Sequence, residues 1–287
     1  MLKYHCRYSI LEAELFYTVK NLTTELYPTG NKNGGESMNA VYQTRQKTRK
    51  LVVIGMLSGI SIFLGLTGLG FINIPPVKAT IMHIPVIIGA IIEGPIVGGL
   101  IGLVFGLFSM YQAFTAPMPT SFMFWNPIIA LVPRILIGVV SYYVYASMIK
   151  GSKKNLKATS IISSLILGVL LFVSSEALTD SLTISAIIGV LFFLASMIIM
   201  FKFKHKNKEE ALSIGTASVI GTLTNTIGVL GLTYVFYLER YASALGITEQ
   251  AATLTLAGIG VTNGIPEAFI SSLISIPVIL GVRKILR

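Results

Sequence analysis

Long apolar stretches separated by short basic clusters dominate this 287-residue sequence. Several of them reach or approach the ~20 residues that an α-helix needs to cross ~30 Å of hydrocarbon. Hydrophobic residues make up 53% of the chain and charged residues only 12%, about half of the charged share in soluble domains. A soluble core could not cover so much apolar surface. The sequence therefore predicts an all-α, polytopic transmembrane helix bundle in the cell membrane.

Eight apolar segments are expected along the chain. They run at about 51–71, 80–92, 95–110, 127–148, 159–173, 184–201, 212–238 and 251–282. The second and third are short and are separated only by Glu93-Gly94-Pro95, a turn signal followed by a proline that suits a helix start. These two form either two tilted helices or one re-entrant hairpin. Two helices are preferred, because the charge pattern then gives a consistent orientation.

The basic residues predict that orientation. With the amino-terminal tail in the cytoplasm, eight segments place only Lys78 and Arg240 near outer ends. Fifteen basic residues lie near inner ends: Arg45, Lys47, Arg49, Lys50, Lys150, Lys153, Lys154, Lys157, Lys202, Lys204, Lys206, Lys208, Arg283, Lys284 and Arg287. This is a strong positive-inside bias, and it is lost if one segment is dropped. Both termini are therefore expected in the cytoplasm.

Four regions are expected. Residues 1–50 form a basic cytoplasmic tail, 51–148 hold the first four segments, 149–211 form an inserted hairpin with basic flanks, and 212–287 hold the last two segments. The polar stretch 1–37 lacks the features of a signal peptide; it is either a disordered tail or sequence upstream of a true start at Met38. A hairpin can be inserted into a six-segment protein without changing the orientation of the rest.

Several function classes lack their motifs. The net charge of +10 lies in clusters between apolar stretches rather than on one face, which argues against a nucleic-acid partner. The single cysteine, Cys6, and three distant histidines have no metal-ligand spacing. The sequence has no Gly-rich phosphate loop with its lysine, and no Ser-His or paired-aspartate motif. We therefore expect a small-molecule transport component without a cofactor, not an enzyme.

Polar side chains inside the predicted spans are the candidate site, because such groups are costly in a bilayer and are often functional. Asn225 lies near the middle of the seventh segment, and Asn263 and Glu267 share one helix face because they are four residues apart. The predicted orientation places four residues in the outer half of the membrane: His83, Arg134, Asn263 and Glu267. Residues from distant segments at similar depth predict a pocket that opens to the outside.

Each of these residues has a structural alternative. Arg134 and Glu267 can pair with each other to make their burial tolerable. His83, which lies beside Pro85, can hydrogen-bond a freed backbone carbonyl, and Asn225 can join packed helices.

Trp125 is an aromatic residue of the type that anchors membrane interfaces. It precedes Asn126 at an expected outer helix start, so it can also line the mouth of a pocket.

Two glycine pairs have the small-xxx-small spacing that lets helices approach closely. Gly55 and Gly59 lie in the first segment, and Gly98 and Gly102 in the third. Such a pair either packs within this chain or provides a docking face for a partner membrane protein.

Four stretches together resemble the S components of energy-coupling factor (ECF) vitamin transporters, which are substrate-binding membrane subunits of bacteria. The stretches are residues 79–89 with 93–107, 132–138, 221–226 and 263–268. They are most similar to the pantothenate-specific branch. The chain departs from the six-helix family pattern in the extra hairpin at about 155–208 and in its long amino-terminal tail.

The resemblance implies a mechanism and partners. An S component captures its vitamin from outside, docks through segment one on a transmembrane coupling protein (the T component) attached to two ATPase subunits, and topples in the membrane to release the vitamin inside. In that family the docking helix carries a small-xxx-small motif, which Gly55 and Gly59 match.

The resemblance also implies roles for the site residues, because pantothenate has one carboxylate, one amide and two hydroxyls. Arg134 would hold the carboxylate, and Asn225 and Asn263 would contact the amide and hydroxyls. Glu267 would orient Arg134 or accept a hydroxyl proton in a hydrogen bond. The segment from Asn73 to Ala79 would be a lid, stiffened by the two prolines within it.

Two alternatives remain open. One is an S component for folate or another vitamin. The other is a stand-alone ion-coupled secondary transporter, which would need repeated halves and broken helices around a midplane site. The sequence shows no clear internal repeat, and Glu267 is the one acidic residue that we place within the bilayer.

Overall fold

The computed structural model describes residues 33–74, 77–117, 119–150 and 205–285, together with Thr183, Ile187 and Val190. The chain divides into two units, residues 1–49 and 50–287, and the candidate site lies within the second. In chain order, the elements are α2 (Asn33–Thr67), β1 (Phe71–Ile74), β2 (Val77–Thr80), α3 (Ile84–Glu93), α4 (Pro95–Thr115), the 3-10 helix η1 (Ser121–Trp125), α5 (Pro127–Lys150), α8 (His205–Leu245) and α9 (Glu249–Ile285).

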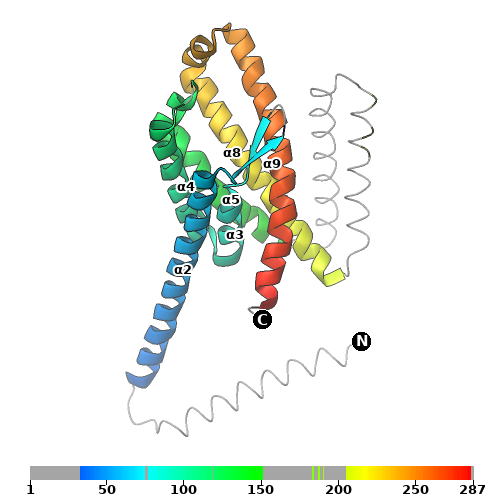
Figure 1. The fold of residues 1–287 in the computed structure, drawn as a ribbon. Helices are drawn as coiled ribbons and strands as arrows, with labels where there is room; N and C mark the ends of the chain where they lie inside the picture. Colours follow the sequence, from blue (N-terminus) through cyan, green and yellow to red (C-terminus); the bar gives the residue numbers. More distant parts are fainter. Residues whose placement is uncertain are drawn as a thin grey trace. The chain divides into compact units, whose positions relative to one another are not determined.

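The described residues are helical apart from one short two-stranded sheet, which the all-α prediction missed (Figure 1). Five of their helices are long and apolar enough to cross a membrane: α2, α4, α5, α8 and α9. The predicted fifth and sixth segments, and most of the predicted hairpin insertion 149–211, lie outside the described residues. The expected count of eight segments therefore stays a prediction.

The second predicted segment, 80–92, was placed too early. The structure has strand β2 up to Thr80, and α3 begins only at Ile84. The predicted lid is an antiparallel hairpin in which Phe71 faces Thr80 and Asn73 faces Lys78. The two prolines expected to stiffen it, at positions 75–76, lie outside the described residues.

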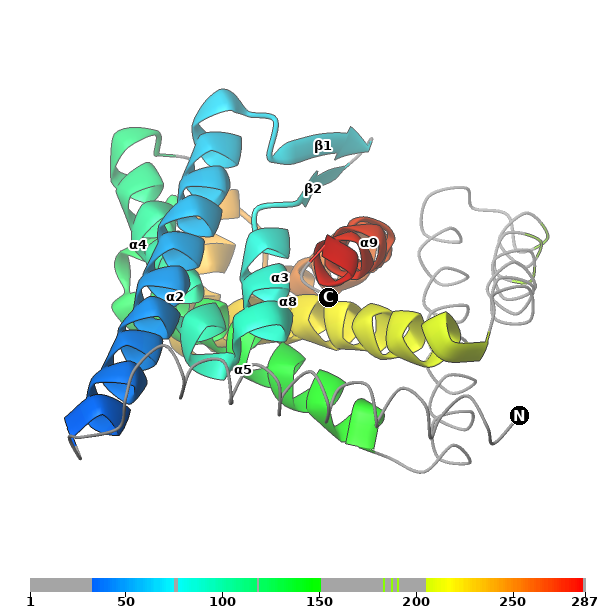
Figure 2. The ribbon, with the colours of Figure 1, turned by 90° about the horizontal axis from the view of Figure 1, so that it is seen from below.

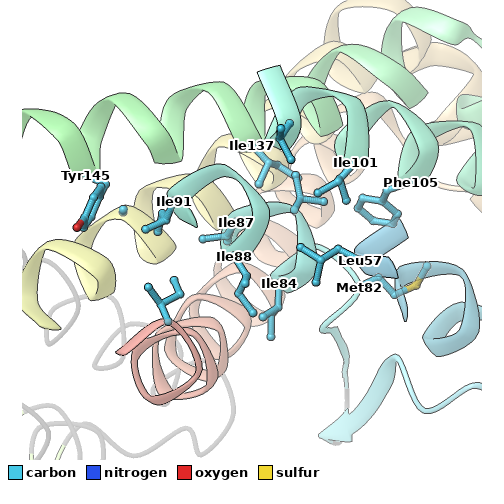
Figure 3. Packing of buried hydrophobic residues seen from close by; sticks show 14 of the residues in the cluster. Leu57, Met82, Ile84, Ile87, Ile88, Ile91, Ile101, Phe105, Ile137 and Tyr145 are labelled. Carbon is cyan, nitrogen blue, oxygen red and sulfur yellow. The ribbon is translucent and has the colours of Figure 1, made fainter. Parts of the chain in front are cut away.

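Helix α3 is the centre of the hydrophobic core. All eight residues from Ile84 to Ile91 are buried, and Figure 3 shows Ile87 of α3 packed with Ile101 of α4 and Ile137 of α5. Ten residues span about 15 Å, roughly half of the hydrocarbon thickness. So short a helix is tolerated at membrane depth because protein surrounds it.

The turn between α3 and α4 is the one expected from the sequence. Gly94 has a φ of 106°, a conformation that a residue with a Cβ rarely adopts. Pro95 occupies the first position of α4, where its missing N–H has no helical partner to lose.

Helix α4 lies directly against α5 along a row of glycines. A Cβ at Gly98 would lie 3.0 Å from the Cα of Gly138, and one at Gly106 would lie 2.7 Å from the carbonyl oxygen of Ala130. Between them, a Cβ at Gly102 would meet the carbonyl oxygen of Arg134. The structure thus confirms packing within the chain for the pair Gly98 and Gly102, because only glycine lets these backbones touch.

Helices α8 and α9 pack side by side, as both views show (Figures 1 and 2). A second hydrophobic cluster joins them to η1, where Phe122 and Met123 pack with Val229 of α8 and Leu256 of α9. Near this cluster α8 is kinked, because Tyr237 has non-helical backbone angles (φ −139°, ψ 19°). The elements that meet here enclose one end of the candidate site.

Candidate functional site

A cavity of about 580 Å³ lies between α4, η1, α5, α8 and α9 and reaches the base of the β-hairpin. This volume is within the range of small-molecule sites. Half of its lining residues are polar: Thr80, Ser109, Gln112, Thr120, Ser121, Arg134, Asn225, Thr226, Tyr241, Asn263 and Glu267. A wall that combines apolar surface with convergent polar groups is typical of a specific ligand site.

The backbone of α5 holds Arg134 in this wall. Pro133 lies inside the helix and has no N–H, so the carbonyl of Ile129 lacks its usual helical donor. The Nη1 of Arg134 donates to that carbonyl at 2.7 Å. Pro133 and Arg134 thus act together, because the carbonyl that Pro133 leaves without a helical donor accepts a hydrogen bond from the guanidinium and holds it in place.

Aromatic rings pack against the same guanidinium. Its central carbon lies 4.8 Å from the ring centroid of Phe124 and 5.7 Å from that of Phe105, distances at which a cation is attracted to a ring face. Arg134 is only 5% exposed, and its Nε has no hydrogen-bond partner within the described ranges. A buried guanidinium with an unpaired N–H donor is costly until that donor meets an acceptor, and it suits an anionic ligand.

Glu267 is hydrogen-bonded to Thr80, whereas the structural alternative required an ion pair with Arg134. Its Oε1 accepts hydrogen bonds from the backbone N–H of Thr80 at 2.7 Å and from the hydroxyl of Thr80 at 3.0 Å. Among the residues that the structure describes, no ion pair joins Glu267 to Arg134. Both side chains line the same cavity, so the described wall carries a guanidinium and a carboxyl group with no direct salt bridge between them.

Two amides complete the predicted set. Asn225 of α8 lines the cavity, and its Oδ1 is buried without a hydrogen-bond partner in the described part of the chain. The neighbouring hydroxyl of Thr224 donates to a carbonyl of its own helix. Asn263 of α9 lines the cavity too, and a Cβ at the adjacent Gly264 would lie 3.1 Å from the Cγ2 of Thr226 on α8. The two helices are therefore packed where their amides reach the cavity.

The structure places three other predicted residues off the cavity wall. His83 is fully buried, and its Nε2 lies 2.9 Å from the hydroxyl oxygen of Thr222 rather than near a freed carbonyl. Trp125 stacks on Phe114 with ring centroids 5.6 Å apart. The Oδ1 of Asn126 accepts from the N–H of Ile128 at 3.0 Å and so caps the start of α5. For Asn73 only the strand backbone is described.

Sequence reasoning missed several polar wall residues because it ended two helices too early. The third segment was expected to end at Met110, but α4 continues to Thr115 and carries Gln112 into the cavity wall. The seventh was expected to end at Leu238, but α8 continues to Leu245 and brings in Tyr241. Residues 111–115 and 239–245 are polar enough to be taken for loops. Continuing the helical spacing of the apolar residues before them would have extended both helices to these wall residues.

The glycine pair of α2 has no contact comparable to that of α4. A Cβ at Gly55 or Gly59 would have nothing within 4 Å in the described residues. Gly55 and Gly59 are exposed, whereas Leu57 on the opposite face of the helix is buried. The face of α2 that carries Gly55 and Gly59 is therefore not used for packing among the residues described.

Comparison with known proteins gives two similar sequences. The Pantothenic acid transporter PanT of Lactococcus lactis subsp. cremoris is 44% identical over 84 residues, which cover 24% of this chain and 43% of that protein. The Pantothenate transporter PanT of Leuconostoc mesenteroides subsp. mesenteroides is 35% identical over 104 residues, covering 34% and 50%. The chain thus spans half or less of the length of these curated relatives.

The match to a family is much longer. The sequence model described as ECF transporter, substrate-specific component, matches residues 49–179 and 169–279, which is most of the chain. This family consists of transport components and not of enzymes. Together with five helices able to cross a membrane, the match shows that the chain is a multi-pass membrane protein that belongs to the family of ECF transporter substrate-specific components.

Proposed function

We propose that this chain is the substrate-binding component of an ATP-driven ECF-type vitamin importer and that its substrate is pantothenate. Family membership supports the first part. The printed names of both similar proteins support the second, although each alignment covers half or less of the relative. The observation on which the proposal rests is the buried Arg134, which has an unused N–H donor and lines a cavity of small-molecule size.

The cavity has the chemistry that pantothenate requires. A guanidinium can bind a carboxylate through two parallel hydrogen bonds. Arg134 already uses Nη1 on the chain itself, so its Nε edge is the one assigned to the ligand. The free Oδ1 of Asn225 accepts from a ligand N–H or hydroxyl, and Asn263 provides a second amide nearby. The apolar wall covers the carbon skeleton.

The proposed topology has eight segments with both termini in the cytoplasm, so that the cavity opens outward. The structure describes five long apolar helices and the short α3, and the proposal adds the predicted pair between 159 and 201. The positive-inside bias supports this orientation. The β1–β2 hairpin would act as the lid, because Gly68 and Thr80, on either side of it, line the cavity.

The proposed partners are a T component and two ATPase subunits, with docking through the exposed glycine face of α2. Small residues let two transmembrane backbones approach closely, and no described part of this chain occupies the space beside Gly55 and Gly59. Docked in this way, the component would topple in the membrane and release its ligand on the inside.

The test is ligand binding to the purified full-length chain, measured calorimetrically against pantothenate, folate and a panel of other vitamins. We expect pantothenate to bind and Arg134→Met to weaken it by about 30-fold or more, because truncating one side of a buried charged contact costs ~2–5 kcal/mol. Arg134→Lys keeps the charge but loses the planar fork, and should fall between the two. Thermal melting of all three proteins shows that they are folded.

Other outcomes would contradict parts of the proposal. Binding of folate instead would overturn the pantothenate assignment and leave the vitamin-import function in place. Full affinity in a folded Arg134→Met protein would remove the carboxylate role. Uptake into vesicles that contain this chain without any ATPase partner would favour the secondary-transporter alternative.

A further inference from the structure

The β1–β2 hairpin is tied to the cavity at a defined point. Its base is closed by backbone hydrogen bonds from the N–H of Gly70 to the carbonyl of Leu64 at 2.8 Å and from the N–H of Ile81 to the carbonyl of Gly70 at 2.9 Å. Its second strand ends at Thr80, which donates twice to Glu267 on α9. Figure 2 shows the hairpin extending from α2 toward α9.

The carboxylate at this point belongs to the cavity wall as well. Glu267 is 5% exposed and lines the cavity. Both hydrogen bonds from Thr80 end on Oε1, and the described residues provide no hydrogen bond to Oε2. The carboxyl group of Glu267 thus contacts the hairpin through Oε1, and its Oε2 is available to a ligand.

We infer that Glu267 is a positioning residue that latches the hairpin over the cavity through Thr80 while its second oxygen remains free for a hydroxyl or N–H of the ligand. This inference rests on the proposed function, because it assigns a lid to the pantothenate site. Two hydrogen bonds from Thr80 to one oxygen, one from the backbone and one from the side chain, favour a single position of the strand. Ligand contact and hairpin closure then depend on the same side chain.

A latch and a simple ligand contact differ in their kinetic consequences. If the hairpin controls access, losing the latch opens it more often and raises both the association and the dissociation rate of the ligand. If Glu267 only touches the ligand, its loss raises the dissociation rate and leaves the association rate close to that of the native protein.

The sharpest variant is Thr80→Val, which removes the hydroxyl and leaves Glu267 unchanged. Thr80→Ser keeps the hydroxyl and should restore native behaviour, and Glu267→Gln removes the charge from the acceptor. Thr255→Val is the matched control, because the exposed Thr255 of α9 donates only to Ala251 of its own helix.

Two measurements on the full chain in one detergent decide the matter. Hydrogen–deuterium exchange of residues 71–80 without ligand should be up to about tenfold faster in Thr80→Val and Glu267→Gln, since the loss of one net hydrogen bond changes an opening equilibrium by about this factor. Stopped-flow binding of pantothenate should show both rates raised several-fold in Thr80→Val. Thr80→Ser and Thr255→Val should match the native protein in both.

Native exchange of residues 71–80 in both Thr80→Val and Glu267→Gln would overturn the latch, as would a rise in the dissociation rate alone. If the native protein binds no pantothenate, the proposed substrate fails, yet the exchange measurement still decides whether Glu267 holds the hairpin. Failure of the inference and failure of the proposed function are therefore distinguishable.

Discussion

Helices α2 and α4 carry the same glycine spacing but use it differently. On α4, Gly98, Gly102 and Gly106 lie against the backbone of α5 so closely that a Cβ would clash. On α2, Gly55 and Gly59 face space that no described residue occupies. A small-xxx-small motif thus marks a surface that permits close approach, and whether a helix of the same chain fills it depends on the rest of the fold.

The two glycine rows also differ in function, because the row on α4 lies near the ligand site and the pair on α2 lies on the proposed docking face. The α4 glycines bring α5 close enough for Gly102 to contact the carbonyl of Arg134, so they help to place the guanidinium. The glycines of α2 are remote from any such contact. We therefore expect changes on α4 to damage the site and changes on α2 to leave it intact.

The largest effect is expected from Gly102→Leu. A Cβ at this position would meet backbone that cannot move aside, and overpacking of a well-packed interior costs ~1–3 kcal/mol or more. We expect a strongly lowered melting temperature and loss of pantothenate binding. Gly99→Ala is the control, because its Cβ would make only ordinary contacts of 3.7 Å and 3.9 Å with Ile135 and Val139. A native melting curve for Gly102→Leu would contradict the packing account.

A smaller effect is expected at Arg283, which joins four helices away from the cavity. It donates to Glu210 of α8 at 2.6 Å, to the carbonyl of Ile91 of α3 at 3.2 Å, and to the hydroxyl of Tyr145 of α5. Arg283→Met should lower stability by about 1–3 kcal/mol, because it removes three hydrogen bonds, one of which is a partly buried ion pair.

The Arg283→Met protein should still bind pantothenate with native affinity, since none of its partners lines the cavity. Lys284→Met, at the exposed neighbouring position, is the control for loss of charge alone. If affinity falls in parallel with stability, the helix ends and the site are more tightly coupled than the contacts indicate.

The smallest effect on the isolated chain is expected from the double change Gly55→Leu with Gly59→Leu. Stability should stay within about 0.5 kcal/mol of the native value, as for other substitutions that touch nothing, and pantothenate affinity should be native. Recovery of the coupling subunits in a pull-down, and transport, should be lost because bulky side chains hold the partner helix away. Intact pull-down would show that this face of α2 is not the docking surface.

Helix starts at prolines were the most predictable local features. The sequence placed helix starts at Pro95 and Pro127, and the structure begins α4 and α5 at these residues. Local stereochemistry explains this success, because proline suits the first turn of a helix. The hairpin was not predictable in the same way. Its strand β1 is as apolar as the end of the first segment, so hydropathy alone extended that segment to Phe71.

The candidate site was predictable only in part. Polar groups within apolar segments identified Arg134, Asn225, Asn263 and Glu267, and the structure brings these four to one cavity. The same reasoning could not separate them from His83, whose Nε2 contacts Thr222 within the bundle and which does not line the cavity. Being polar and buried is common to ligand residues and to internal hydrogen-bond partners, so the distinction requires the positions of neighbouring helices.

The sequence by itself determined that this protein lies in a membrane and which few polar side chains lie within its apolar segments. Both depend on the hydrophobicity and helix-start preferences of residues close together in the chain. The tertiary structure alone decided which glycine face is filled and which stays open. It also decided that Glu267 binds Thr80, 187 positions away, rather than Arg134. Such pairings depend on how helices distant in sequence are packed, and no local pattern records that arrangement.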